Sequence, residues 1–355
     1  MNRARRRLFY DAQHALWERS PAHQPLRPVR LPADEGVHAF PLEWWYLIGQ
    51  VETLDSGPSV RFGFELTVAR LGNPLTGGSA GWSSVFALLD GGTERYTAVE
   101  RKVFPPASPV VSSRGGFSFR VRPGLAGGGD WLLRGEGGAF HVRAAAEGRG
   151  IDLDLKATRP AVKFGQDGVM DYAHREEMAW YSWTRLETEG TVQVDGVSRR
   201  VRGLGWLDHQ WGAPRLERYR WKVLPMWLSD GTDLLCYRFS DDAGRPLKQY
   251  AARVWPDGHH RDDAAEVHII DLDPPWIAGP GLVYHPRSRV RIPDWGLDLR
   301  VEPLVLDQRK DTDALVQSFP VWWEGSCDVR GTVIGESGEE TEISGRAFTE
   351  IAGVE

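Results

Sequence analysis

The chain has 355 residues, which is long for a single hydrophobic core, so two domains or one large β-structure is expected. Its 49 acidic and 43 basic side chains give a net charge of −6, which argues against a general nucleic-acid partner. The only cysteines, Cys236 and Cys327, lack the CxxC spacing of a zinc site and form no disulfide framework, although a single bridge between them stays open.

Residues 1–35 differ from the rest of the chain. Arginines among the first seven residues precede apolar residues at helical spacing that end at Trp17, which predicts a short amphipathic helix. Four prolines between 21 and 32 then predict an extended connector. The helix has two open uses: docking on the protein, which we expect because one short helix is a weak anchor, or peripheral contact with an anionic membrane surface.

No apolar run approaches the roughly 20 residues that a membrane helix needs. The amino terminus also lacks an apolar signal core, so we expect a cytoplasmic protein, membrane-associated only if the first helix binds lipid.

From Phe40 onward the sequence is typical of strands. Apolar and polar residues alternate over 60–69, the period of a half-buried antiparallel strand, and again over 117–121, 140–142, 151–155, 297–301 and 341–348. Asp-Gly pairs predict tight turns, and Asp195-Gly196 predicts a hairpin. We therefore expect an all-β fold of two antiparallel barrels, spanning residues 36–200 and 201–355, after the 1–35 helix and connector.

The second arm of that hairpin leads into the segment Gly203–Gly212, which reads GLGWLDHQWG. Asp208 and His209 are adjacent there, between Trp206 and Trp211. Successive side chains of a strand point to opposite faces, so both can enter one cavity only if the strand ends and the chain bends. The segment lies near the expected domain junction, a common place for ligand pockets. A strand end with core tryptophans is the alternative interpretation.

The chain contains 16 tryptophans and only 4 methionines. This excess favours an aromatic-lined pocket for an apolar or carbohydrate-like small molecule. Indole side chains that fill the interior of a β-barrel are an equally open explanation.

Several motifs occur in a fixed order from about residue 40 to 350. They are Glu43-Trp44-Trp45-Tyr46 with Gly49, Phe62–Thr67, Tyr181-Ser182 with Thr184-Arg185-Leu186, Gly205–Trp211, Trp221 with Leu228–Thr232, and Trp322-Trp323-Glu324-Gly325. Together they resemble the carotenoid 1,2-hydratase and AttH family of lipocalin-like proteins. The resemblance implies two lipocalin-like β-barrels in one chain. The wider group includes isoprenoid alkene hydratases, a phytoalexin hydratase and fungal cyclases.

The resemblance also implies roles for His209 and Trp211, and for a Tyr and an Asp on a strand about 25 residues later. Here that strand contains Tyr237 but no acid. This departure argues against carotenoid hydration itself.

Hydration of an alkene begins with proton delivery, leaves a cation and ends with capture of water. Asp208 is our candidate acid, because burial among indoles raises the pKa of a carboxyl group. His209 would position the water or accept its proton, and Tyr237 would help to orient that water. The expected substrate-binding residues, which line the pocket or face the cation, are Glu43, Trp45, Tyr181, Trp206, Trp211, Trp221 and Trp323.

Three other features were weighed. Glu43 and Glu324 are each beside tryptophan and could act as a second acid, but we expect them to pair with Arg185 or Arg238. Residues 259–263 contain two histidines and two aspartates, yet no distant partner of defined spacing, so we expect no metal. We expect no cofactor either, and the oligomeric state stays open.

The sequence therefore predicts an enzyme that acts on an apolar isoprenoid or polyene-like substrate by alkene protonation, giving hydration, isomerisation or cyclisation. Two alternatives stay open. One is a pericyclic cyclase, in which pocket shape folds the substrate. The other is a non-catalytic lipid or pigment carrier, since a closed barrel can hold one ligand.

Overall fold

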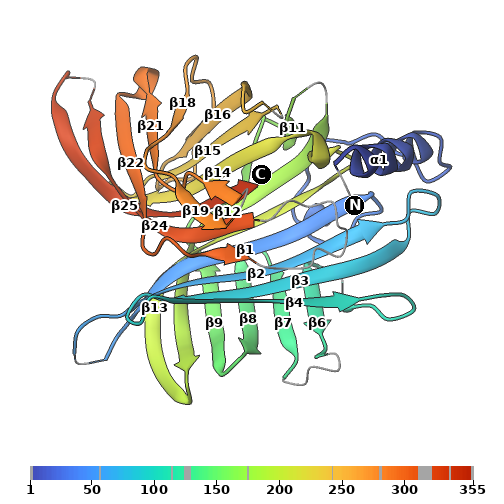
Figure 1. Ribbon diagram of the computed structural model, residues 1–355, viewed down its shortest axis with the longest axis horizontal. Coiled ribbons are helices and arrows are strands. Elements are labelled where there is room, and N and C mark those ends of the chain that lie inside the picture. Colours follow the sequence, from blue (N-terminus) through green and yellow to red (C-terminus); the bar gives the residue numbers. More distant parts are fainter. Residues whose placement is uncertain are drawn as a thin grey trace. The chain divides into compact units, whose positions relative to one another are not determined.

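The computed structural model of the chain describes residues 3–55, 57–112, 115–123, 129–173, 176–241, 243–279, 282–310, 322–335 and 337–352. The structure is almost entirely antiparallel β-sheet with one short α-helix, which confirms the predicted fold class (Figure 1). Two compact units make up the chain. The first ends at Leu216, so it extends beyond the expected boundary at residue 200.

The first unit contains the long antiparallel sheet ordered β4-β3-β2-β1-β13-β12-β9-β8-β7-β6-β5, with β10 and β11 paired to β12. Its strands are β1 (Leu42–Thr53), β2 (Arg61–Gly72), β3 (Ser79–Asp90), β4 (Arg95–Val103), β5 (Val110–Ser112), β6 (Phe117–Val121), β7 (Trp131–Glu136), β8 (Ala139–Ala146), β9 (Arg149–Ala157), β10 (Val162–Lys163), β11 (Val169–Asp171), β12 (Glu177–Val194) and β13 (Val197–Gly212). Because β13 pairs with both β1 and β12, it is an interior strand of this sheet and belongs to the first unit.

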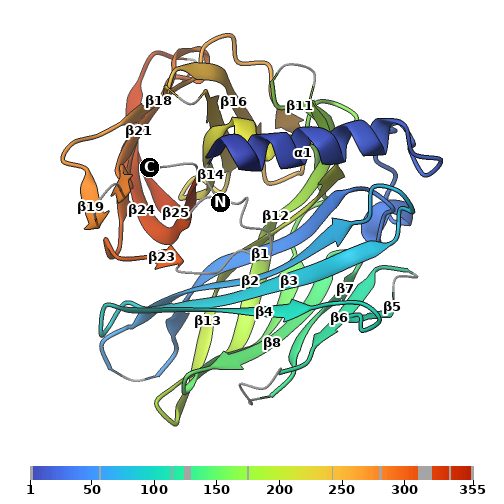
Figure 2. The ribbon, with the colours of Figure 1, turned by 45° about the vertical axis from the view of Figure 1, so that its right-hand side comes forward.

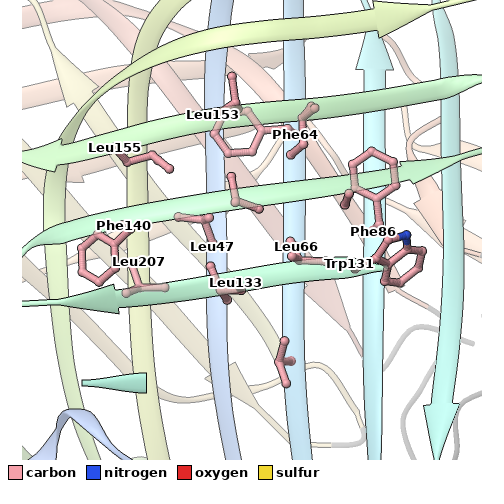
Figure 3. Packing of buried hydrophobic residues seen from close by; sticks show 14 of the residues in the cluster. Leu47, Phe64, Leu66, Phe86, Trp131, Leu133, Phe140, Leu153, Leu155 and Leu207 are labelled. Carbon is pink, nitrogen blue, oxygen red and sulfur yellow. The ribbon is translucent and has the colours of Figure 1, made fainter. Parts of the chain in front are cut away.

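The sheet of the first unit curls so that strands β1–β4 cross over β6–β9 (Figure 2). Apolar side chains from both layers fill the space between them, among them Leu47, Phe64, Phe86, Trp131 and Leu207 (Figure 3). On β13 the odd-numbered Leu207 faces this core, so odd positions near it point inward and even positions point outward.

The predicted hairpin between β12 and β13 is confirmed. Val194 pairs with Val197, and the two turn residues, Asp195 and Gly196, have φ values of 49° and 83°. Two consecutive positive φ angles are the signature of the tight turn that Asp-Gly favours.

The second unit contains a sheet ordered β17-β16-β15-β14-β25-β24-β22-β21-β18, with β23 paired to β24, and the small pair β19-β20. Its strands are β14 (Arg220–Leu228), β15 (Asp233–Ser240), β16 (Pro246–Val254), β17 (His260–Arg261), β18 (His268–Asp271), β19 (Trp276–Gly279), β20 (Leu282–Tyr284), β21 (Ser288–Ile292), β22 (Leu297–Pro303), β23 (Arg309–Lys310), β24 (Trp322–Ile334) and β25 (Glu340–Ala352). Three short 3-10 turns occur in the described residues. Ala33–Glu35 belongs to the first unit, Leu216–Arg218 spans the point where the first unit ends and the second begins, and Pro293–Trp295 belongs to the second unit. This sheet also curls around its own apolar core.

The predicted amino-terminal helix is α1 (Arg3–Glu18). Trp17, near its end, is buried against Val29, Phe40, Tyr181 and Trp211 of the first unit. No helix in the described part of the chain is long and apolar enough to cross a membrane. The two free cysteines, Cys236 and Cys327, are buried and unbridged.

Candidate functional site

Asp208 and His209 lie on opposite faces of one strand. β13 continues without a break to Gly212, so the bend that would bring both side chains into one cavity does not occur. Across the neighbouring strands Asp208 is opposite Tyr46 and Ser182, whereas His209 is opposite Trp45 and Tyr181. The strand therefore carries two separate polar clusters, one on each face.

The outward face holds Asp208 in a cluster of neutral donors. Its Oδ1 atom accepts hydrogen bonds from Trp206 Nε1 at 2.6 Å, from Trp180 Nε1 at 3.1 Å and from the Ser182 hydroxyl. Trp206 lies two residues earlier on the same strand, while Trp180 and Ser182 come from β12. Within the described part of the chain no hydrogen bond reaches Oδ2, and no basic side chain pairs with this carboxyl group.

Burial governs the protonation of Asp208. The side chain is only 2% exposed, and removal from water raises its pKa to about 6 even though the three hydrogen bonds act in the opposite direction. A protonated carboxyl group near neutral pH is what an acid catalyst requires. Two indoles border the carboxyl group, as expected, but they belong to Trp206 and Trp180, whereas Trp211 and His209 lie on the other face.

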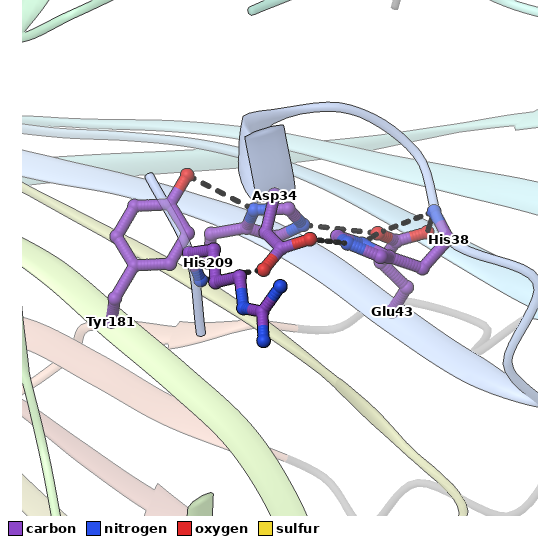
Figure 4. A network of polar contacts seen from close by, with 6 residues as sticks. Asp34, His38, Glu43, Tyr181 and His209 are labelled. Atoms are coloured by element: carbon purple, nitrogen blue, oxygen red, sulfur yellow. Dashed lines mark hydrogen bonds and ion pairs between the residues drawn. The ribbon is translucent and has the colours of Figure 1, made fainter. Parts of the chain in front are cut away.

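The inward face holds His209 in a chain of titratable groups (Figure 4). Its Nε2 atom lies 3.0 Å from Glu43 Oε1, and its Nδ1 atom lies 3.1 Å from the Tyr181 hydroxyl. Glu43 also contacts His38, whose Nδ1 atom is 2.7 Å from Oε1 and whose backbone amide donates to both carboxylate oxygens at 3.0 Å. The chain ends at Asp34, 3.5 Å from His38 Nε2.

Charge in this cluster is divided unevenly. Burial lowers the pKa of His209 to about 4, so its imidazole is neutral at pH 7. Burial would raise the pKa of Glu43, but hydrogen bonds from His209 and His38 outweigh it and hold that pKa below its usual value. For His38, hydrogen bonds to Asp34 and Glu43 overcome burial and raise the pKa. Glu43 is therefore the ionised carboxylate and His209 a neutral donor, and of the two imidazoles His38 takes up a proton more readily.

Aromatic side chains fix the rings of this inward cluster. Trp45 stacks on His209 with 4.2 Å between ring centroids, and Trp211 stacks on His38 at 3.9 Å. The inward cluster therefore contains five of the predicted site residues: Glu43, Trp45, Tyr181, His209 and Trp211. The outward cluster contains two, Asp208 and Trp206.

The remaining predicted site residues belong to the second unit. Trp221 Nε1 donates to Glu350 at 2.6 Å, and Tyr237 stacks on Tyr250 with ring centroids 4.9 Å apart. Trp323 is part of the apolar core, where its Nε1 atom donates to the Leu306 carbonyl at 2.7 Å. None of these three residues lies in either cluster on β13.

Arg238, an expected partner of the two tryptophan-flanked glutamates, pairs with neither of them. Glu43 pairs with histidines, and Glu324 forms a buried ion pair with Lys310 at 2.5 Å. Arg238 instead binds Asp271. These pairings depend on which strands and loops meet in the folded chain. The spacing of residues along the sequence does not predict which ones meet.

Four contributors were missed: Asp34, His38, Trp180 and Ser182. The last two flank Tyr181, which was selected, so strand alternation around that residue was the available signal. Asp34 lies in the 3-10 turn at the end of the connector, and His38 lies between that turn and β1, where the sequence shows no strand or helix pattern.

A curled antiparallel sheet in each of two units is a lipocalin-like architecture. The chain belongs to the AttH-like family, whose model matches residues 22–354. No curated protein matches it in sequence.

Solved structures share the fold at low identity. A protein assigned as AttH (NE1406) from Nitrosomonas europaea is 23% identical with a TM-score of 0.77, covering 93% of this chain and 98% of its own. Kievitone hydratase from Nectria haematococca is 16% identical with a TM-score of 0.69, covering 92% and 93%. CghA is 12% identical with a TM-score of 0.56, covering 93% and 95%. At these identities the likenesses establish the fold alone.

Proposed function

We propose that the protein is an enzyme that protonates an alkene of an apolar, isoprenoid or polyene-like substrate, giving hydration, isomerisation or cyclisation. The observation that carries the proposal is the buried Asp208 carboxyl group, held through one oxygen by three neutral donors. The name of one structural neighbour, kievitone hydratase, supports a reaction of this class.

In the proposed step the protonated Asp208 gives its proton to the less substituted alkene carbon. The π electrons form the new C–H bond and leave a tertiary cation on the neighbouring carbon. Hydrogen bonds from Trp180, Trp206 and Ser182 stabilise the carboxylate that remains, because they already point at Oδ1.

The fate of the cation sets the product. Capture of water followed by return of one proton to Asp208 gives the alcohol. Loss of a different proton to Asp208 gives an isomer. Attack by a second alkene closes a ring and moves the positive charge to a new carbon, which then loses a neighbouring proton to Asp208 and becomes an alkene. Each route returns one proton to the carboxylate. His209 faces the other side of β13, so this mechanism does not use it as the base.

The test uses solvent deuterium. The protein is incubated in ²H₂O with squalene, geranylgeraniol and a prenylated phenol, and the products are examined by mass spectrometry. Every product of alkene protonation is expected to carry a new carbon-bound deuterium. A hydration product also gains the mass of one water molecule, whereas an isomer or a product of proton-initiated cyclisation does not. A cyclic product without deuterium identifies pericyclic cyclisation instead, and recovery of bound but unchanged compound identifies a carrier.

The matched variants are Asp208→Asn and Asp154→Asn. The second removes an exposed carboxyl group of the first unit. Asp208→Asn is expected to lower deuterium incorporation at least ~100-fold, within the range for loss of a general acid, while tryptophan fluorescence still reports binding. Asp154→Asn should retain full activity. Full incorporation by Asp208→Asn would refute the assigned acid.

A further inference from the structure

The inward cluster contains a set of ligand atoms that suits a metal ion. His38, Glu43 and His209 each offer one nitrogen or oxygen, and these atoms lie within 4.8 Å of one another. Within the part of the chain that the structure describes, no other group of three such side chains is this compact. His259 and His260, which were considered as metal ligands in the sequence analysis, are not part of this group.

The three ligand atoms are close together, with the carboxylate oxygen next to both nitrogens. Glu43 Oε1 lies 2.7 Å from His38 Nδ1 and 3.0 Å from His209 Nε2. In a tetrahedral zinc site, bonds of ~2.1 Å separate neighbouring ligand atoms by ~3.4 Å. An ion therefore requires Glu43 Oε1 to move away from both nitrogens by less than about 1 Å.

Each histidine has an oxygen partner on its other ring nitrogen. Asp34 Oδ1 lies 3.5 Å from His38 Nε2, and the Tyr181 hydroxyl lies 3.1 Å from His209 Nδ1. Histidines that bind metals regularly donate their second N–H to a carboxylate or another oxygen, which fixes the tautomer and the ring orientation. The stacked Trp45 and Trp211 rings hold the same two imidazoles in place.

Within the described residues no arginine or lysine donates a hydrogen bond to the Glu43 carboxylate, although Arg70 attracts it at longer range. Arg70 is opposite Glu43 in the sheet, but its guanidinium donates to the carbonyls of Phe40 at 2.7 Å and Gly77 at 2.6 Å. The described hydrogen bonds of Glu43 come from His38 and His209 alone. Both partners are groups whose protons a metal ion can displace.

We propose that His38, Glu43 and His209 bind one divalent transition-metal ion of the Zn²⁺ class. Two imidazoles and one carboxylate are a donor set that zinc accepts, and three protein ligands leave a fourth position open. The His38 side chain is 18% exposed, whereas Glu43 and His209 are fully buried, so an ion enters from the His38 side. The site lies on the opposite face of β13 from Asp208 and is independent of the proposed acid.

The experiment measures zinc binding by the full chain. The protein is stripped with a chelator, titrated with Zn²⁺ in a calorimeter, and analysed for bound zinc after desalting. One ion per chain is expected. Co²⁺ serves as a second probe, because its visible absorption reports four-coordinate nitrogen and oxygen ligation.

Two variants test the assignment of ligands. His38→Gln removes the partly exposed ligand and is expected to weaken Zn²⁺ binding more than ~100-fold. His141→Gln is the matched control, since His141 also lies beside carboxylates, Asp152 and Asp154, but at the surface. It should bind one ion as tightly as the unmodified chain.

Asp34→Asn and Tyr181→Phe retain all three ligands and are each expected to weaken binding ~10- to 100-fold through the outer partners. If His38→Gln does not fold, the Zn²⁺ affinities of these two variants test the proposed site instead. Absence of stoichiometric zinc in the unmodified chain, or equal affinity in His38→Gln or in both outer variants, would overturn the site. The role of Asp208 is tested separately, by measuring deuterium incorporation in the presence of a chelator, so that failure of the metal site and failure of the proposed acid can be told apart.

Discussion

The two faces of β13 bury carboxyl groups in opposite ways. Asp208, on the outward face, is surrounded by two indole N–H groups and a hydroxyl group, and its pKa rises to about 6. Glu43 contacts the inward side of the same strand, is equally buried, and has a lowered pKa because two imidazoles bind it. Burial therefore does not set the charge of a carboxyl group by itself; the charge that its partners can carry decides it.

The inward cluster is expected to be the more sensitive to loss of its carboxylate. Glu43→Gln removes the buried carboxylate that binds both imidazoles and the His38 amide, and loss of one partner of such a buried pair costs about 3–5 kcal/mol of stability. Urea unfolding in the presence of a chelator measures the change.

Asp154→Asn is the control for that variant. It breaks a histidine–carboxylate contact of 2.9 Å to His141, but the Asp154 side chain is 79% exposed. Exposed pairs contribute little, so a change of less than about 1 kcal/mol is expected. Equal effects of the two variants would show that burial of the Glu43 pair is not what matters.

His209 and Asp208 are expected to give opposite pH dependences. The pKa of His209 is about 4 in the folded chain and 6.5 when unperturbed, so between these values the unfolded chain binds the extra proton. Stability from this group is present above pH 6.5 and is lost as pH falls toward 4, by on the order of 3 kcal/mol. In chelator, the stability of the unmodified chain relative to His209→Gln should fall over this range.

For Asp208 the sign is reversed. Its pKa is about 6 in the folded chain against 3.8 when unperturbed, so between these values the folded chain holds the extra proton. Stability is present below pH 3.8 and lost as pH rises through 6, by on the order of 3 kcal/mol. Asp208→Asn should therefore gain stability relative to the unmodified chain between pH 4 and 7. A difference between the two proteins that does not vary with pH would show that the carboxyl group is not perturbed.

Local pattern was sufficient for most of the fold. Alternation predicted the strands, and Asp195-Gly196 predicted the hairpin that joins β12 to β13. Period-two spacing also allows Trp206 to share a face with Asp208. These inferences succeed because each depends only on residues close together in the chain.

The partners of Asp208 and His209 across β12 could not be predicted in the same way. Counting back from the hairpin turn would place Trp183 opposite Asp208. A register shift between Trp183 and Leu186 places Ser182 there instead, and Tyr181 opposite His209. A shift of one residue exchanges the faces of every following side chain, so this irregularity decides which cluster each residue joins.

Ser182, positioned by that shift, gives the smallest expected effect. Ser182→Ala leaves Oδ1 of Asp208 with the indole donors Trp180 and Trp206, so about 0.5–1.5 kcal/mol of stability is lost. The lost hydrogen bond favoured the carboxylate, so the pKa of Asp208 should rise further. Carbonyl infrared difference spectra against Asp208→Asn measure that pKa. An unchanged pKa would mean that the Ser182 hydrogen bond does not stabilise the Asp208 carboxylate, and that the neutral donors on this face do not offset burial as the imidazoles around Glu43 do.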